Sequence, residues 1–126
     1  MDIGPLQELI LKIVWERGEM PAPELVEAVN ARSAESYSYK SVANSAEILR
    51  RKGLLRRRMI GRVGYYRPGK MRDEYISETW AEALKRGVEA FGAPVASNLV
   101  DAVEMADPKA VDELIEELRR RGYIKG

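Results

Sequence analysis

The 126-residue sequence contains no cysteine and no histidine. Without cysteine the chain has neither disulfides nor thiolate chemistry, and without either residue it lacks the usual ligands of zinc and copper. The absence of histidine also removes the side chain that most often transfers protons in enzymes near neutral pH. A metal sensor is therefore not expected, and we expect no cofactor. An enzyme would need paired carboxylates or an activated serine or lysine, and no spacing here indicates one.

Long apolar runs and a basic leader are also missing. Gln7, Glu8 and Lys12 interrupt the apolar residues of the opening segment MDIGPLQELILKIVW. This segment therefore resembles neither a signal peptide nor a membrane-spanning helix. We expect a cytoplasmic protein with no membrane partner. Its length suits one domain with a real core, or a small domain with an appendage.

The net charge of +1 conceals an uneven distribution along the chain. Residues 1–70 hold 13 basic and 8 acidic side chains, whereas residues 71–126 hold 8 and 12. Nine basic residues and no acidic one lie between Ile48 and Met71: Arg50, Arg51, Lys52, Arg56, Arg57, Arg58, Arg62, Arg67 and Lys70. Runs of charge are usually a solvated surface, but a run without acids favours a polyanionic partner such as nucleic acid.

Apolar spacing predicts three helices in the first half of the chain. The first begins at Pro5 and stops at Gly18, and the second covers residues 23–31. The third covers residues 38–52, with Ser38 as its N-cap and a stop at Gly53. Residues 20–22 can form a short strand between the first two helices.

A hairpin is predicted after the third helix. Residues 54–60 and 63–67 have the pattern of two short strands joined at Gly61, and Pro68 ends the second. A helix followed by a hairpin is the order of a recognition helix and its wing. The predicted fold class is therefore mainly α with a small β-wing: a winged helix-turn-helix DNA-binding domain in residues 1–70, followed by a helical region in residues 71–126.

Candidate DNA contacts come from the third helix and the wing. Val42, Ala46 and Leu49 share one helix face that we expect to meet the core, which leaves the other face for a ligand. Asparagine can pair with adenine, serine can donate or accept, and lysine or arginine can reach guanine or phosphate. The candidates are Ser38, Tyr39, Lys40, Ser41, Asn44, Ser45, Arg51, Arg56, Arg58, Arg62, Tyr65 and Arg67.

Each candidate also has a simpler interpretation. The small polar residues are typical of helix caps and solvated helix positions, and Arg62 can be an ordinary turn residue beside Gly61. Arg56 and Arg58 alternate along one strand, so they are expected on one face of the wing, where both can contact phosphates.

Three further helices are predicted in residues 71–126. They cover about residues 72–91, residues 95–103, and a segment that starts at Asp107 and Pro108 and stops at Gly122. Without a sheet of their own, these helices leave apolar stripes that a second copy of the chain can cover. The predicted dimer-interface residues are Ile76, Trp80, Leu84, Phe91, Leu99, Val103, Leu114, Ile115 and Leu118. Acidic residues early in these helices are explained by the helix dipole rather than by a metal site.

The run from Tyr39 to Pro68 resembles the penicillinase and methicillin-resistance repressors, the BlaI, MecI and CopY group. The matching segments are YKSV at 39–42, KGL at 52–54, GR at 61–62 and YRP at 66–68. The opening helix, which ends in VWERGE, and the C-terminal helices are also similar to that family. The resemblance implies a winged-helix repressor that binds a dyad-symmetric operator as a dimer held together by its C-terminal helices. It also implies the third helix in the major groove and the wing at 54–67 on the flanking backbone.

The sequence departs from the family at several positions. Ala46 and Ile48 stand where leucine and arginine are usual, so core packing and base preference are expected to differ. Asp101 and Ala102 stand where the antibiotic-responsive members have the Asn-Phe bond that is cleaved, so penicillin-linked proteolysis is not expected. The cysteine cluster of the copper-responsive members is absent.

Two functions thus remain open from the sequence. The first is a homodimeric, sequence-specific transcriptional regulator of double-stranded DNA, with repression and dimerisation implied by the resemblance. The second is a protein-interaction module that uses the winged helix as a scaffold, because a fold does not determine a function. The sequence identifies neither the operator, the regulated genes, the inducing signal nor any small-molecule effector.

Overall fold

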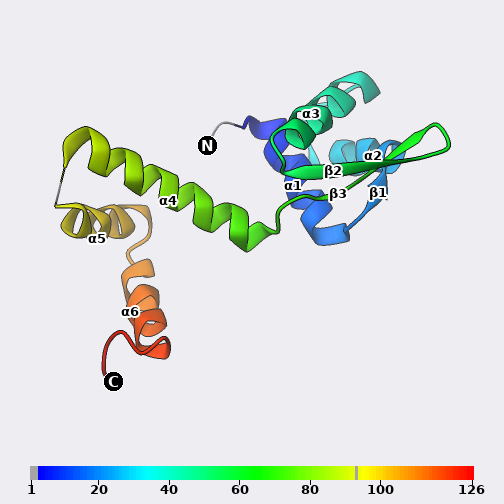
Figure 1. Cartoon of the computed structure of the whole chain (residues 1–126). Helices are drawn as coiled ribbons and strands as arrows, with labels where there is room; N and C mark the ends of the chain where they lie inside the picture. Colours follow the sequence, from blue (N-terminus) through cyan, green and yellow to red (C-terminus); the bar gives the residue numbers. More distant parts are fainter. Residues whose placement is uncertain (1–2, 93) are drawn as a thin grey trace. The chain divides into compact units, whose positions relative to one another are not determined.

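The computed structural model describes residues 3–92 and 94–126 (Figure 1). The helices and strands in these residues are α1 (Pro5–Arg17), β1 (Met20–Pro21), α2 (Ala22–Arg32), α3 (Tyr39–Arg51), β2 (Leu55–Ile60), β3 (Val63–Pro68), α4 (Arg72–Phe91), α5 (Val95–Ala106) and α6 (Ala110–Arg120). The predicted fold class and order of elements are confirmed. The chain forms two compact units, one ending at Thr79 and the other beginning at Trp80.

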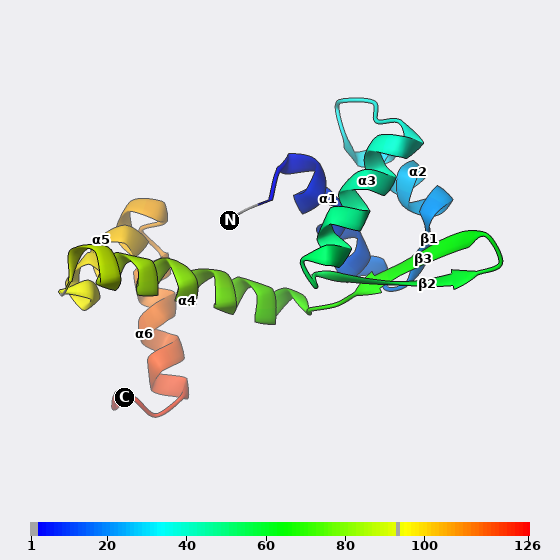
Figure 2. The same cartoon turned by 45° about the horizontal axis from the view of Figure 1, so that its top comes forward.

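The first unit packs three helices against a small antiparallel sheet of strand order β1-β3-β2 (Figure 2). Helices α1, α2 and α3 contact one another, and each also contacts the sheet. In the part of the chain that the structure describes, every buried side chain is apolar or tyrosine, so burial of apolar surface holds this unit together. The largest fully buried side chains are Ile10, Leu11, Ile13, Val14, Met20, Leu25, Val29, Val42, Leu49 and Leu55.

The start of α3 is held by two polar side chains. The Ser38 hydroxyl accepts the backbone N–H of Ser41 at 3.1 Å, which confirms Ser38 as the N-cap. The preceding loop is closed by Asn30 of α2, whose Nδ2 donates to the Tyr37 carbonyl at 2.9 Å and whose Oδ1 accepts the Tyr37 N–H at 2.7 Å. One asparagine therefore satisfies both backbone groups of the residue just before the cap.

The end of α3 turns directly into the hairpin at Gly53. Gly53 has a φ of +79°, a left-handed conformation that glycine adopts without strain, and it ends the helix as predicted. The N–H of Leu54 then donates to the Leu49 carbonyl at 2.9 Å. Gly69, the residue after β3, packs closely onto this turn, and its N–H donates to the Leu54 carbonyl at 2.9 Å. A Cβ at Gly69 would lie only 2.4 Å from the Gly53 oxygen, so a larger residue does not fit there.

The first turns of α4 belong to the first unit. The indole Nε1 of Trp15 donates to the Lys70 carbonyl at 2.9 Å, and its ring lies 5.7 Å from that of Tyr75. Tyr75 packs against the buried core, so the compact unit continues to Thr79. The assignment of DNA binding to residues 1–70 and of dimerisation to residues 71–126 remains a prediction.

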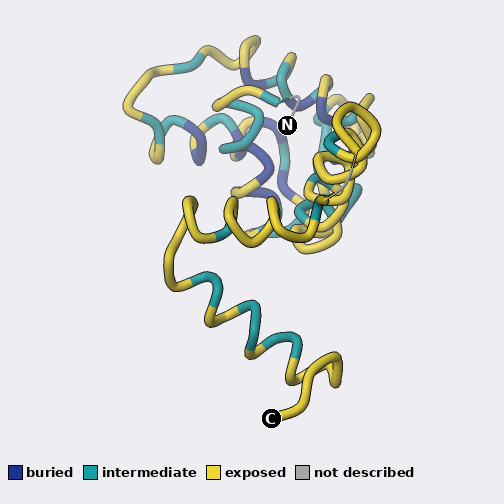
Figure 3. Tube along the Cα trace, turned by 90° about the vertical axis from the view of Figure 1, so that its left-hand side faces the viewer, coloured by how far each residue is buried: buried dark blue, intermediate teal, exposed yellow. Residues whose placement is uncertain are grey.

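Helices α5 and α6 contact each other in the second unit. Figure 3 shows the contrast between the units: buried positions lie in the first, whereas the described residues from 80 onward are exposed or half-buried. Helix α6 begins two residues after Pro108, because Asp107 first forms a turn in which its Oδ1 accepts the Lys109 N–H at 3.0 Å. Ala93, in the predicted break after α4, lies outside the described residues. No helix in residues 3–92 or 94–126 has the length and apolarity needed to cross a membrane.

The two hydrogen bonds between Asn30 and Tyr37 give a stability prediction. Asn30→Ala removes the partners of both Tyr37 backbone groups, so we expect the free energy of unfolding to fall by about 1–3 kcal/mol. The matched control is Asn44→Ala, because Asn44 is exposed on α3 and has no hydrogen-bond partner among the described residues. Alanine favours helix there, so this control should be at least as stable as the unmodified protein. Denaturant unfolding followed by circular dichroism measures both, and equal stability of the two variants would contradict the role given to Asn30.

Candidate nucleic-acid interface

The exposed face of α3 carries most of the predicted base-reading residues. Val42, Ala46 and Leu49 are at most 1% exposed, which confirms the predicted inward face of this helix. On the outer side, Lys40, Ser41, Asn44 and Arg51 are exposed and Ser45 is half-buried. Because residues four apart are neighbours along a helix, Lys40 and Asn44 form one row and Ser41 and Ser45 form a second row beside it. This arrangement brings five predicted contacts onto one helix face.

Ser38 and Tyr39 lie at the start of this face. The Ser38 hydroxyl is already engaged, because it caps the helix and lies 3.0 Å from the Ser41 hydroxyl, to which it donates. Tyr39 is 53% exposed, and its phenol is therefore available to a ligand. Ser38 has a clear structural role, whereas contact of either residue with DNA remains a prediction.

The β2–β3 hairpin has two faces with different surroundings. Along β2, Leu55 is buried and Arg57 forms an ion pair with Glu47 of α3, so this face of the strand meets α3. Side chains alternate along a strand, so Arg56 and Arg58 lie on the opposite face, as expected from their spacing.

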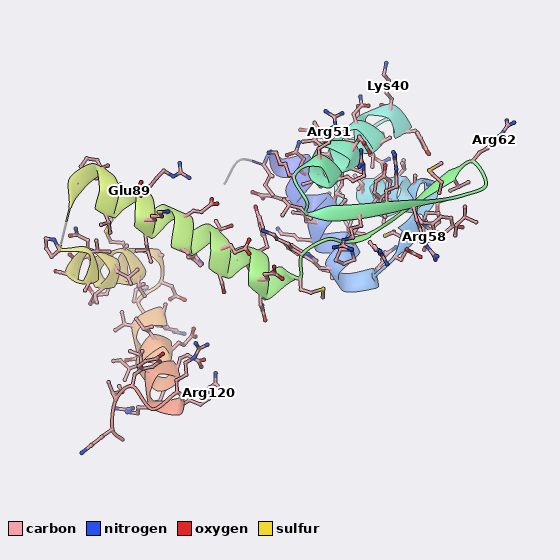
Figure 4. The ribbon with its side chains drawn as sticks, viewed as in Figure 1. Lys40, Arg51, Arg58, Arg62, Glu89 and Arg120 are labelled. Carbon is pink, nitrogen blue, oxygen red and sulfur yellow. The ribbon has the colours of Figure 1, made fainter. Side chains whose placement is uncertain are left out.

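The cross-strand partners extend this outer face of the hairpin. Arg56 pairs with Arg67 and Arg58 pairs with Tyr65, so these four predicted contacts share the face that is turned away from α3. Figure 4 shows Arg58 on that side, whereas Lys40 and Arg62 project from the side on which α3 lies. The structure therefore brings the wing tip, but not the outer face of the hairpin, onto the same side as the recognition-helix candidates.

Glu47 was not among the residues singled out from the sequence. Its Oε1 accepts the Nε–H of Arg50 at 2.8 Å, and its Oε2 accepts an Nη1–H of Arg57 at 3.0 Å. The side chain is 21% exposed, and the hydrogen bond from Arg50 is the main cause that lowers the pKa of Glu47. The ion pair between Glu47 and Arg50 could be predicted from their three-residue spacing on a helix, whereas the contact between Glu47 and Arg57 depends on the tertiary fold.

A second carboxylate holds a cation on the outer face of the hairpin. Glu19 lies just before β1 in the sequence, and both of its oxygens accept the Nε–H of Arg58 at 3.0 Å. These hydrogen bonds raise the pKa of Arg58. The basic run contains no acid in sequence, yet the fold supplies carboxylates to Arg50, Arg57 and Arg58 from elsewhere.

Other predicted cations have no such partner. Among the residues that the structure describes, no carboxylate lies within ion-pair distance of Lys40, Arg51, Arg56, Arg62 or Arg67, and all five are exposed. Arg62 follows Gly61 at the tip of the wing (Figure 4). These side chains carry charge that is available to phosphates.

The predicted dimer-interface residues lie on α4, α5 and α6. Trp80 is 67% exposed and Phe91 is 90% exposed, and none of the predicted set is buried in the single chain. Glu116 and Glu117 of α6 are paired with arginines at the C-terminal end of that helix. Glu117 accepts hydrogen bonds from Arg120 and Arg121, which lower the pKa of its carboxyl group to about 2.

Comparison with known proteins supplies the family. The model of the penicillinase repressor family, described as "Penicillinase repressor", matches residues 3–120. No curated protein matches the sequence. The solution structure of the DNA-binding domain of the repressor BlaI is 23% identical, with a TM-score of 0.52 over 59% of this chain and 88% of that one.

The RosR structures from H. salinarum extend the likeness beyond the winged helix. RosR is 14% identical, with a TM-score of 0.51 over 86% of this chain and 96% of that chain. RosR in its S4 complex gives 15% identity and a TM-score of 0.52 over 87% and 93%. At these identities the structural likeness shows the fold alone. The family match covers nearly the whole sequence, and the chain therefore belongs to the penicillinase repressor family, whose members are DNA-binding transcriptional regulators and not enzymes.

Proposed function

We propose that this protein is a homodimeric repressor that binds a dyad-symmetric operator in double-stranded DNA. In this proposal α3 enters the major groove, the wing at 54–67 contacts the flanking backbone, and residues 71–126 join the two subunits. Occupation of a promoter would then exclude RNA polymerase. The family membership supports transcriptional regulation, and the arrangement of α3 supports the mode of binding.

The observation that carries the proposal is the division of α3 into two faces. One face is buried against α1 and α2 through Val42, Ala46 and Leu49. The opposite face presents Lys40 and Asn44 to solvent. Figure 4 shows Lys40 on the same side as Arg62. A major groove admits a helix of this kind, and its base edges offer the donors and acceptors that such polar side chains recognise.

We assign different roles to the polar residues on that face. Asn44 can make a bidentate pair with adenine, and Ser41, Ser45 and Lys40 can contact neighbouring base edges or phosphates. Arg51 lies at the C-terminal end of α3, where a long cation suits the phosphate backbone. The outer-face residues Arg56, Arg58, Tyr65 and Arg67 can contact DNA only if the duplex also reaches that face.

The exposed apolar residues of α4 to α6 support the dimer. The described residues from 72 onward contain no buried side chain, yet they include large apolar groups such as Trp80, Leu84 and Leu99. Apolar surface of this extent marks an interaction site in a water-soluble protein, and a second copy has the same surface to offer.

The direct test is fluorescence anisotropy with labelled duplexes across a salt series. One duplex comes from the region upstream of the protein's own gene, and the other has a scrambled sequence. Selective binding by two chains per duplex, with affinity that falls steeply as salt rises, is the expected result. Weak binding that salt does not change would favour the protein-interaction function instead.

Substitutions at Arg62 and Asn44 separate backbone contact from base reading. Arg62→Ala should weaken binding to all sequences and reduce the slope of log affinity against log salt by about one. Asn44→Ala should cost about 1–3 kcal/mol of binding free energy, chiefly on the preferred duplex. An Asn44→Ala variant that keeps the full sequence preference would contradict the base-reading role.

Glu47 and Glu19 make a matched pair for locating the DNA. Glu47→Gln releases Arg50 and Arg57 on the α3 side, so binding to scrambled DNA should tighten and the salt slope should steepen by up to about two. Glu19→Gln releases Arg58 on the outer face and should leave both quantities unchanged. Fluorescence anisotropy across a salt series measures both quantities. A steeper slope for Glu19→Gln alone would place the duplex on the outer face.

The dimer is tested by a charge on α4. Trp80→Glu places a carboxylate at a position that is 67% exposed in the single chain, so the fold should survive while pairing is lost. Sedimentation equilibrium should then give the single-chain mass of 14.2 kDa instead of twice that value. The control is Lys85→Glu, on the other side of α4 by helix periodicity, which should remain dimeric. A dimeric Trp80→Glu variant would exclude this face from the interface.

A further inference from the structure

Ile48 is an apolar residue on the side of α3 that faces DNA in the proposed function. Ile48 is 36% exposed, and it is not among the partly buried apolar residues that pack against the core. It follows Asn44 by four residues and Ser45 by three, so it lies beside both on the helix surface. Three residues later comes Arg51, which is also exposed. On the surface of α3, Ile48 is therefore an apolar side chain whose neighbours along the helix are polar.

Ile48 is not part of the apolar core. The inward contacts of α3 are made by Val42, Ala46 and Leu49, which are at most 1% exposed. Helix propensity does not account for Ile48, because a β-branched side chain is less favourable in a helix than alanine or leucine. An isoleucine can neither neutralise a phosphate nor form a hydrogen bond with a base edge, so its contribution to an interface must come from apolar contact.

The major groove offers one apolar group on its base edges, the C5-methyl group of thymine. We propose that Ile48 packs against this methyl group and makes a thymine part of each half-site. One turn of helix advances about 5.4 Å and successive bases are about 3.4 Å apart, so this thymine should lie one or two base pairs from the base that Asn44 contacts. The inference rests on the proposed function and adds a specificity residue to it.

Replacement of thymine by deoxyuridine tests this contact, because deoxyuridine pairs in the same way but lacks the methyl group. A preferred duplex is first selected from a random library with the unmodified protein. Each thymine of the half-site is then replaced in turn, and the dissociation constant is measured. One position should weaken binding about three- to fivefold per half-site, the effect expected for loss of one buried methyl group.

The same series is repeated with Ile48→Ala. This variant should bind the thymine duplex about as weakly as the unmodified protein binds the deoxyuridine duplex, and it should no longer distinguish the two. Because Ile48 is partly exposed and alanine favours helix, the variant should fold, which circular dichroism verifies. The control is Ile60→Ala, another isoleucine on the surface, which is 48% exposed in β2 and should retain full sensitivity to the methyl group.

Two outcomes overturn the proposal while the proposed function stands: no single deoxyuridine weakens the unmodified protein, or Ile48→Ala remains as sensitive as the unmodified protein. A selection that yields no preferred sequence would overturn the proposed function as well. Loss of methyl discrimination in Ile48→Ala, with discrimination kept in Ile60→Ala, would support the contact between Ile48 and thymine.

Discussion

The packing of α3 through Val42, Ala46 and Leu49 is the contact on which the rest of the interface depends. These side chains are at most 1% exposed, and through them α3 packs against α1 and α2. A helix has a fixed rotation per residue, so burial of this stripe determines which residues face water. Ala46 is the smallest of the three, and a larger side chain there would have to displace neighbouring helices in a densely packed core. The outward direction of Lys40, Asn44 and Ile48 is thus a consequence of apolar packing on the opposite side.

Two ion pairs of the basic run, those of Arg57 and Arg58, depend on the fold rather than on the local sequence. Glu47 binds Arg50 and Arg57, and Glu19 binds Arg58, although the basic run itself contains no acid. An arginine held by a carboxylate has to give up that partner before it can neutralise a phosphate, so its net contribution to binding is small. In the proposed complex, fewer free cations on the α3 side mean less affinity for DNA of any sequence, and a larger share of the binding energy then depends on base contacts.

Much of the fold could be predicted from the sequence, because its signals are local. Ser38 is a cap residue before a helical pattern, Gly53 adopts a conformation that favours glycine, and Gly61 separates two short strands. The buried stripe of α3 followed from helix periodicity alone. The late start of α6 was missed, because the turn made by the Asp107 side chain competes with the helix that Pro108 was expected to begin.

The candidate site was harder to predict, because it depends on contacts between distant residues. Arg58 and Glu19 are 39 positions apart, and no periodicity joins them. Strand alternation did place Arg56 and Arg58 on one face, but only the ion pair between Arg57 and Glu47 shows which face meets α3. Helix periodicity places Ile48 beside Asn44, but its exposed fraction of 36% depends on the tertiary structure.

The two hydrogen bonds between Asn30 and Tyr37 limit the effect that sequence changes in the preceding loop can have on α3. Both backbone groups of Tyr37 are hydrogen-bonded to Asn30 of α2, so the position of the first turn of α3 does not depend on the four residues 33–36, beyond their ability to span the gap. The first turn of α3 is thus held by hydrogen bonds within the chain, and the DNA binding proposed for α3 need not include the entropic cost of ordering that turn. Insertions and replacements in residues 33–36 should therefore accumulate without moving the exposed face of α3.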